Sequence, residues 1–230
     1  KMRDAVVVGE RKFAIRRAPK PVLDKDEVLI KVRCCGICGS DLHTYILGIP
    51  GRYGHEYAGD IVAVGSEVKG WKAGDRVTAE SACSCNECYW CTQGEMGLCE
   101  TFLERWGASS GGFATYTKTK YQQLHKLPTE LSYEEASLTE PTAVALHAIR
   151  LSGMLTGDVV AVLGLGPIGQ LVARLVKISG AKAVYASETS KSRIKLAKGA
   201  VDEVIDARKV DPAVRILELT SGRGPDMVFE

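Results

Sequence analysis

The sequence predicts a two-domain α/β protein, in which a β-rich domain is followed by a doubly wound parallel domain. In the first part, short runs rich in Val, Ile and Tyr are broken by Gly, Pro and Asp, as at Val28–Val32, Ile61–Val64 and Arg76–Ala79, which is typical of strands and turns. Further on, β-branched runs alternate with helical patterns, and one run enters a glycine-rich turn. This alternation predicts a parallel sheet covered by helices. We place the domains at residues 1–135 and 136–230.

Composition and charge exclude several functional classes. The 230 residues are 45% hydrophobic and 25% charged, as in an ordinary globular protein and unlike a disordered or collagen-like one. Lys and Arg number 30 against 28 Asp and Glu, so no basic excess favours nucleic acid or an anionic membrane as partner. No apolar run approaches the roughly 18 residues of a membrane span, and Lys1–Val8 lacks the features of a secretory signal. We expect a cytoplasmic protein.

Eight cysteines fall into two clusters, at residues 34–38 and 83–99. In a chain without an export signal, clustered thiols indicate metal binding more often than disulfides. Four members of the second cluster follow the spacing C-x2-C-x2-C-x7-C, namely Cys85, Cys88, Cys91 and Cys99. Four thiolates at this spacing can surround one zinc ion and leave no open coordination position. We therefore predict a structural zinc site, with Cys83 outside its ligand set.

The first cluster offers fewer ligands, of mixed type. It combines C-G-I-C-G-S-D-L-H at residues 35–43 with G-H-E at residues 54–56. One Cys, one His and one carboxylate would make a three-ligand zinc site, which keeps its fourth position for water or a substrate oxygen. Each residue alone is weak evidence, because a histidine beside glycines is more often a hydrogen-bonded structural residue. The combination predicts a catalytic metal.

These motifs resemble those of the zinc-containing medium-chain alcohol dehydrogenases. The pattern Gly-His-Glu-x2-Gly-x5-Gly-x2-Val at residues 54–68 is similar to the family signature, and the cysteine quartet and the Cys38 segment resemble the family's as well. The resemblance implies a GroES-like catalytic domain followed by a Rossmann NAD-binding domain. It also implies a homotetramer or homodimer. Against the family pattern, the chain stops after the fourth strand of the Rossmann domain, so we expect that domain to be incomplete at its C-terminus.

Glu140 stands where many family members have a cysteine zinc ligand. Its Glu-Pro dipeptide resembles the polyol branch, which contains sorbitol, butanediol, threonine and sugar dehydrogenases. In that branch the resemblance implies a catalytic zinc held by Cys38, His55 and Glu140, with Glu56 as an exchangeable ligand or a partner of a zinc-bound water. Asp41 would accept the other imidazole N–H of His55 and so fix its tautomer; a turn or cap role is the alternative.

Ser40 and His43 match the family's proton relay. There zinc lowers the pKa of the alcohol oxygen, Ser40 takes the proton, and the nicotinamide ribose passes it to His43. The implied reaction is hydride transfer from a polyol or other secondary alcohol to NAD, giving a ketone. Substrate choice depends on residues such as those near Tyr45 and Trp106, so threonine, butanediol and sugar dehydrogenases stay open. A non-catalytic nucleotide-binding scaffold is the alternative from another functional class.

The second domain carries a dinucleotide-binding pattern. The run Asp158-Val-Val-Ala-Val-Leu enters G-x-G-x-x-G, whose glycines are Gly164, Gly166 and Gly169, and a helical pattern follows. In this strand, turn and helix context the glycines let the backbone approach a pyrophosphate, which would sit on the helix that begins near Pro167. Ile168 resembles the family's apolar wall behind the nicotinamide, with core packing as the alternative.

Glu188 follows the next predicted strand, Ala183–Ser187, and lies 19 residues past Gly169. A carboxylate there can accept hydrogen bonds from the adenosine ribose hydroxyls and repel a 2′-phosphate, which favours NAD over NADP. Lys191 and Arg193 follow closely and could bind a phosphate, so NADP stays the alternative.

Overall fold

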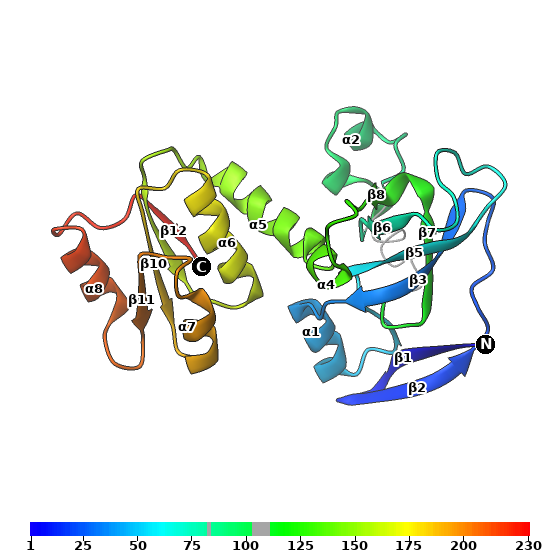
Figure 1. The fold of residues 1–230 in the computed structure, drawn as a ribbon, viewed down its shortest axis with the longest axis horizontal. Coiled ribbons are helices and arrows are strands. Elements are labelled where there is room, and N and C mark those ends of the chain that lie inside the picture. Colours follow the sequence, from blue (N-terminus) through cyan, green and yellow to red (C-terminus); the bar gives the residue numbers. More distant parts are fainter. Residues whose placement is uncertain (82–83, 103–110) are drawn as a thin grey trace. The chain divides into compact units, whose positions relative to one another are not determined.

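The chain folds into two units, Lys1–Glu140 and Pro141–Glu230, and the division falls inside helix α5 (Thr139–Ser152). A computed structural model describes residues 1–81, 84–102 and 111–230 (Figure 1). Within those ranges, no helix has the length and apolar character that a bilayer span requires. Each unit is described in turn.

Two antiparallel sheets make up the first unit. The larger has the strand order β7-β3-β5-β6-β8, and its strands are β3 (Glu27–Cys35), β5 (Tyr57–Val64), β6 (Arg76–Ala79), β7 (Tyr116–Lys120) and β8 (Leu124–Lys126). The smaller has the order β2-β1-β4, with β1 (Met2–Gly9), β2 (Lys12–Ala18) and β4 (Gly51–Arg52). The three strand runs predicted from the sequence lie in β3, β5 and β6.

The central pair of the larger sheet brings two distant segments together. Val28 and Ile30 of β3 pack with Tyr57 and Ile61 of β5 in a buried core. In the antiparallel register Cys35, the last residue of β3, pairs with Tyr57, the first of β5. The segments that follow β3 and precede β5 therefore leave the sheet side by side.

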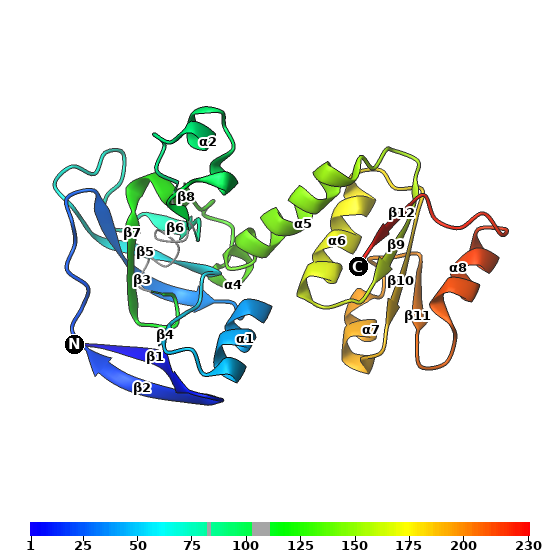
Figure 2. The same cartoon turned by 180° about the vertical axis from the view of Figure 1, so that it is seen from behind.

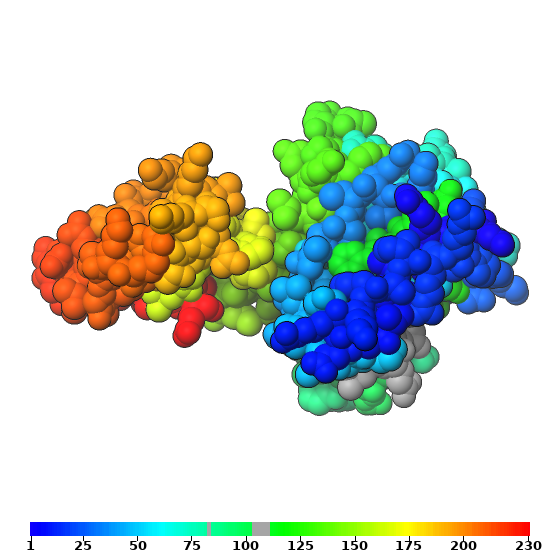
Figure 3. Space-filling model, turned by 90° about the horizontal axis from the view of Figure 1, so that it is seen from below, coloured from blue at the N-terminus to red at the C-terminus, as the bar shows by residue number. Residues whose placement is uncertain are grey.

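Short helices complete the first unit. They are α1 (Gly39–Leu47), α2 (Tyr89–Thr92) and α4 (Tyr133–Ala136), with 3-10 turns at Met96–Leu98 and Tyr121–Gln123. Helix α1 ends at Gly48, whose φ of +67° is a left-handed conformation that favours glycine. The helix lies against the β1–β2 hairpin, since Arg11 N–H donates to the Tyr45 carbonyl at 2.8 Å and the Phe13 and Tyr45 rings stack. Figure 3 shows this blue-coloured region as one continuous surface.

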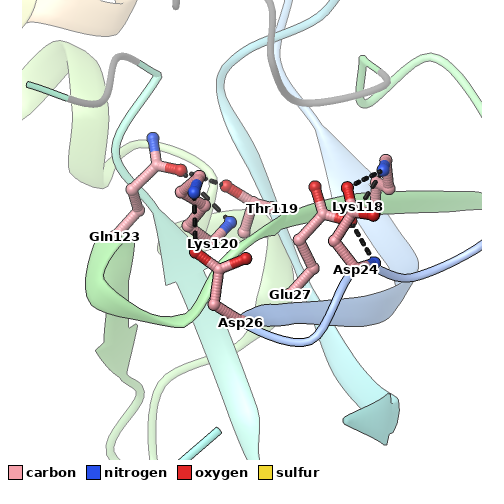
Figure 4. Close-up of polar contacts among 7 residues, drawn as sticks. All are labelled: Asp24, Asp26, Glu27, Lys118, Thr119, Lys120 and Gln123. Atoms are coloured by element: carbon pink, nitrogen blue, oxygen red, sulfur yellow. Dashed lines mark hydrogen bonds and ion pairs between the residues drawn. The ribbon is translucent and has the colours of Figure 1, made fainter. Parts of the chain in front are cut away.

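Charged pairs tie β7 to the beginning of β3 (Figure 4). Lys118 Nζ lies 2.6 Å from Glu27 Oε2 and 3.5 Å from Asp24 Oδ2. Lys120 Nζ lies 2.6 Å from Asp26 Oδ2. Because these lysines are partly buried, solvent screens the pairs less than it would fully exposed ones, and the pairs help to hold β7 in register.

The second unit is one parallel sheet with helices on both faces. Its strand order is β11-β10-β9-β12, and every pair is parallel. The strands are β9 (Val159–Leu163), β10 (Ala183–Glu188), β11 (Glu203–Asp206) and β12 (Met227–Phe229), and the helices between them are α6 (Pro167–Ile178), α7 (Lys191–Ala197) and α8 (Pro212–Leu219). An order that reverses direction at β9 is that of a doubly wound sheet, which confirms the predicted fold class.

Side chains alternate between the two faces of this sheet. Val160 and Val162 of β9 pack with Val172 and Val176 of α6, whereas Ala161 between them packs with the opposite cluster, which contains Ile216 of α8. Helices α6 and α7 thus cover one face and α8 the other, as the views from front and back show (Figures 1 and 2). Burial on both faces explains why β9 reads as a continuous apolar run.

Candidate metal centre and nucleotide site

Three of the predicted metal ligands converge at the end of the β3–β5 pair. Cys38, His55 and Glu56 each offer one ligand atom, and these atoms all lie within 4.8 Å of one another. Cys38 is the N-cap of α1, just after β3, while His55 and Glu56 directly precede β5. Glu56 is buried and the other two are half-buried. A thiolate, an imidazole and a carboxylate so placed suit a zinc ion.

Glu140 lies outside that group of three, but its charge interacts with those of Glu56 and His55. Burial raises the pKa of Glu140, which the charge of His55 lowers and that of Asp41 raises. The pKa of Glu56 is raised by burial and then by the charge of Glu140. A cation between such carboxylates would relieve both effects. The geometry favours Glu56 as the third member, and the predicted assignment to Glu140 with an exchangeable Glu56 stays a prediction.

Asp41 holds the two ligand segments together. Its Oδ2 accepts the Cys38 N–H at 2.8 Å and its Oδ1 accepts the Gly54 N–H at 3.2 Å. His55 Nδ1 lies 4.0 Å from Oδ1, which is beyond hydrogen-bond range. The hydrogen bonds of Asp41 are therefore those of a cap residue, which was the alternative role considered for it in the sequence analysis.

Ser40 and His43 lie three residues apart on α1, both exposed. Side chains at this spacing share one face of a helix, and that helix begins at the candidate ligand Cys38. Substrate choice was expected to depend on residues such as those near Tyr45 and Trp106. Tyr45 stacks on Phe13 with ring centroids 5.0 Å apart, and Trp106 lies outside the described residues.

The cysteine quartet forms a second candidate metal group. The Sγ atoms of Cys85, Cys88, Cys91 and Cys99 all lie within 4.8 Å of one another. Backbone N–H groups already donate to the sulfurs, from Cys88 to Cys85 at 3.2 Å and from Cys85 to Cys99 at 3.3 Å. The Thr101 hydroxyl, together with the Cys85 N–H, lowers the pKa of Cys99 to about 6. Such donors stabilise thiolates, the form that binds zinc.

The described cysteines of both clusters are free thiols. They number seven, and Cys83 lies outside the described residues. Burial raises the pKa of the Cys35 thiol to about 12, so Cys35 behaves as a packed side chain next to the metal group.

The glycine-rich turn joins β9 to α6. Gly164 has a φ of +90°, and Gly166 is the N-cap of the helix, with Pro167 as its first residue. A Cβ at Gly169 would collide with the carbonyl oxygen of Gly164, so glycine there allows the helix to lie close to the turn. By helix geometry the amides of Ile168 and Gly169 point out of the N-terminal end, where an anion can bind them.

Glu188 is the last residue of β10 and lies next to the glycine-rich turn. Its Oε2 accepts the Leu165 N–H at 2.9 Å, and its Oε1 accepts the N–H groups of Thr189 at 2.7 Å and Ser190 at 2.9 Å. These bonds, the one from Ser190 first, lower the pKa of Glu188 to about 2. Arg193 Nη1 lies 3.6 Å from Oε2. The carboxylate is buried and stays ionised at neutral pH.

Gln170 is a residue of this site that the sequence analysis missed. It is buried on α6, and its amide donates to the Arg193 carbonyl at 3.1 Å, while Arg174 Nη1 donates to its Oε1 at 2.7 Å. Gln170 thus links α6 to α7 behind the turn. The available signal was a polar residue on the buried face of α6, whose other buried members are Val172, Ala173 and Val176.

Comparison with known proteins identifies similar chains. Residues 24–129 match the alcohol dehydrogenase GroES-like domain, and residues 167–230 match the zinc-binding dehydrogenase model. A sorbitol dehydrogenase of Halalkalibacterium halodurans is 38% identical over 96% of this chain and 67% of its own length. An L-threonine 3-dehydrogenase of Bacillus licheniformis is 37% identical over 96% of this chain and 66% of its own length.

A solved structure agrees with these relatives. The crystal structure of 2R,3R-butanediol dehydrogenase from Bacillus subtilis superposes with a TM-score of 0.87 at 38% identity, and the match covers 100% of this chain and 70% of that one. The chain thus spans about two thirds of the length of the relatives it matches. The resemblance and the fold inferred from the sequence motifs are confirmed.

Proposed function

The chain belongs to the zinc-containing medium-chain alcohol dehydrogenase family, and from that premise we propose that it oxidises a polyol or other secondary alcohol to a ketone, with NAD as hydride acceptor. The observation that carries the proposal is the convergence of Cys38, His55 and Glu56, since a three-ligand zinc site keeps a position for substrate.

Two zinc ions per chain are part of this proposal. Cys38 and His55, with Glu56 or Glu140 as the third ligand, would hold the first, and the quartet of Cys85, Cys88, Cys91 and Cys99 would hold the second. When bound, the first ion would act as a Lewis acid that makes the alcohol proton easier to remove.

The chain's own residues would handle the proton. Ser40 and His43 share a face of α1 that begins beside the metal group, so the Ser40 hydroxyl can accept the alcohol proton. The exposed His43 then delivers it to solvent. NAD, when bound, would accept the hydride from the carbon that carries the hydroxyl, so the proton lost from oxygen and the two electrons lost with the hydride are both accounted for.

The cofactor in this proposal is NAD rather than NADP. The amides of Ile168 and Gly169 would bind the pyrophosphate. The ionised, buried Glu188 would repel a 2′-phosphate, and Arg193 is already within 3.6 Å of that carboxylate, which reduces its availability to a phosphate.

Zinc content is the first test. We expect two zinc ions per wild-type chain, one in Cys38→Ala, and two in Cys34→Ala, a matched control from the same cysteine cluster. One zinc in the wild type that survives Cys38→Ala would overturn the catalytic-site assignment.

Substrate assays form the second test. Sorbitol and 2,3-butanediol are offered with NAD or NADP, and L-threonine is included because a relative carries that activity in its name. We expect NADH formation with at least one polyol or diol. A chain that binds zinc and NAD but oxidises none of these alcohols would favour the scaffold alternative.

A further inference from the structure

Glu188 binds backbone groups of its own fold, besides the ribose hydroxyls that we propose for it. Its carboxylate accepts backbone N–H groups from two segments, the glycine-rich turn through Leu165 and the start of α7 through Thr189 and Ser190. We propose that Glu188 is a positioning residue that clamps the glycine-rich turn to the β10–α7 junction, and that affinity for the pyrophosphate part of a dinucleotide depends on this clamp. The inference rests on the proposed NAD site and deepens it.

The clamp is one of two adjacent links between the turn and β10. Gly164 N–H donates to the Ser187 carbonyl at 2.9 Å, and Leu165 N–H donates to Glu188 Oε2 at 2.9 Å. Consecutive amides of the turn are thus bound by consecutive residues of the strand. The Leu165 side chain is fully buried in the core beneath, so the turn is fixed from below and from the side.

Burial makes the clamp costly to lose. Only 7% of Glu188 is exposed, so water has little access to replace its hydrogen bonds. A neutral glutamine keeps the shape but has one acceptor oxygen, and its amide would turn an N–H donor toward a backbone N–H donor. Glu188→Gln therefore breaks at least one of the three backbone bonds, and a buried donor left without an acceptor is expensive.

The effect of the clamp on nucleotide affinity can be distinguished from the effect of ribose recognition. The next amides along the chain, at the start of α6, are those that would bind the pyrophosphate. If the turn loses its side anchor, these amides are no longer held in one arrangement before binding, and the ligand must order them. The loss of affinity should therefore be as large for a ligand without ribose hydroxyls as for one that has them.

The test compares adenosine diphosphate with its 2′,3′-dideoxy analogue, by calorimetric titration of the zinc-loaded chain. We expect Glu188→Gln to weaken binding of the dideoxy analogue by on the order of tenfold, the effect of one lost charge-assisted hydrogen bond. Asp202→Asn is the matched control. Asp202 accepts the Val184 N–H at 2.7 Å on the same strand, but at the end remote from the turn, so its loss should leave nucleotide affinity unchanged.

An unchanged affinity of Glu188→Gln for the dideoxy analogue, with a reduced affinity for adenosine diphosphate, would overturn the clamp and leave ribose recognition alone. Amide hydrogen exchange on the ligand-free chain gives an independent reading. The clamp predicts faster exchange at Leu165 in Glu188→Gln, with no change at core amides such as Val160. Should the wild type bind neither nucleotide, the proposed cofactor fails, and equal Leu165 exchange in both chains would then reject the clamp as well.

Discussion

The N–H of Gly36 donates to the carbonyl oxygen of Glu56 at 2.7 Å, and the Glu56 carboxylate occupies the space that a Cβ at position 36 would need. The Glu56 carboxylate can therefore lie beside Cys38 and His55 only because residue 36 is a glycine.

Gly36→Ala should displace the Glu56 carboxylate and lower the zinc content from the proposed two ions per chain to one, because the collision involves the oxygen that we propose as a ligand. Zinc content and the visible spectrum of the cobalt-substituted chain measure this. Gly39→Ala is the control, since among the described residues nothing approaches within 4 Å of a Cβ at Gly39. Full zinc content in Gly36→Ala would instead assign the third ligand to Glu140.

Asp41→Ala should lower the free energy of unfolding by about 1–3 kcal/mol, since it leaves the Cys38 and Gly54 amides without their acceptor. Urea denaturation measures the change. Asp75→Ala removes a similar acceptor, for the Lys72 N–H at 3.0 Å, from a more exposed turn, and should cost less. Equal losses in the two variants would contradict the special position of Asp41.

The difference in unfolding free energy between the wild type and Glu188→Gln should depend on pH. The pKa of Glu188 falls from an ordinary 4.5 to about 2 in the fold, so its contribution is fully present above pH 4.5 and is lost as pH falls toward 2. Urea denaturation at several pH values should show a constant difference from pH 7 to 5 that shrinks below pH 4.5. A difference independent of pH would show that the carboxylate charge is not what stabilises the turn.

Gly169→Ala and Gly166→Ala should separate folding from ligand binding. A Cβ at Gly169 meets the Gly164 carbonyl oxygen, whereas one at Gly166 has its nearest neighbour, Arg193 Nη1, at 4.0 Å. Gly169→Ala should therefore lower thermal stability as well as NAD affinity, and Gly166→Ala should fold normally but bind NAD more weakly. Unaltered stability of Gly169→Ala would show that α6 can shift away from the turn.

Elements with strong local signals were predictable from the sequence. The run from β9 through the glycine-rich turn to β10 agrees closely with the structure, because a continuous apolar strand, three glycines and a second strand are all local features. Helix α1 was not predicted. Its nine residues are too few for a strong helical pattern. Its first turn is held by Asp41, which accepts the Cys38 N–H and also the Gly54 N–H across the fold.

The hydrogen bonds of Glu188 were beyond sequence analysis for a similar reason. The acid at the end of β10 was identifiable, but its bond to Leu165 spans 23 residues and exists only once the parallel strands pair. The convergence of Cys38 with His55 was predictable only as a motif, since their proximity depends on the Cys35–Tyr57 register.

Because the Asp41 carboxylate accepts hydrogen bonds from both Cys38 and Gly54, the loop that contains α1 is closed without a metal ion. An ion entering there need not supply the chain entropy of that closure, so it can exchange with solution while the surrounding backbone keeps its shape. The quartet differs, because its sulfurs lie on a segment of short turns, so we expect zinc to contribute more to the stability of that segment. The two sites should therefore release zinc to a chelator at different rates, the first without unfolding and the second together with its segment.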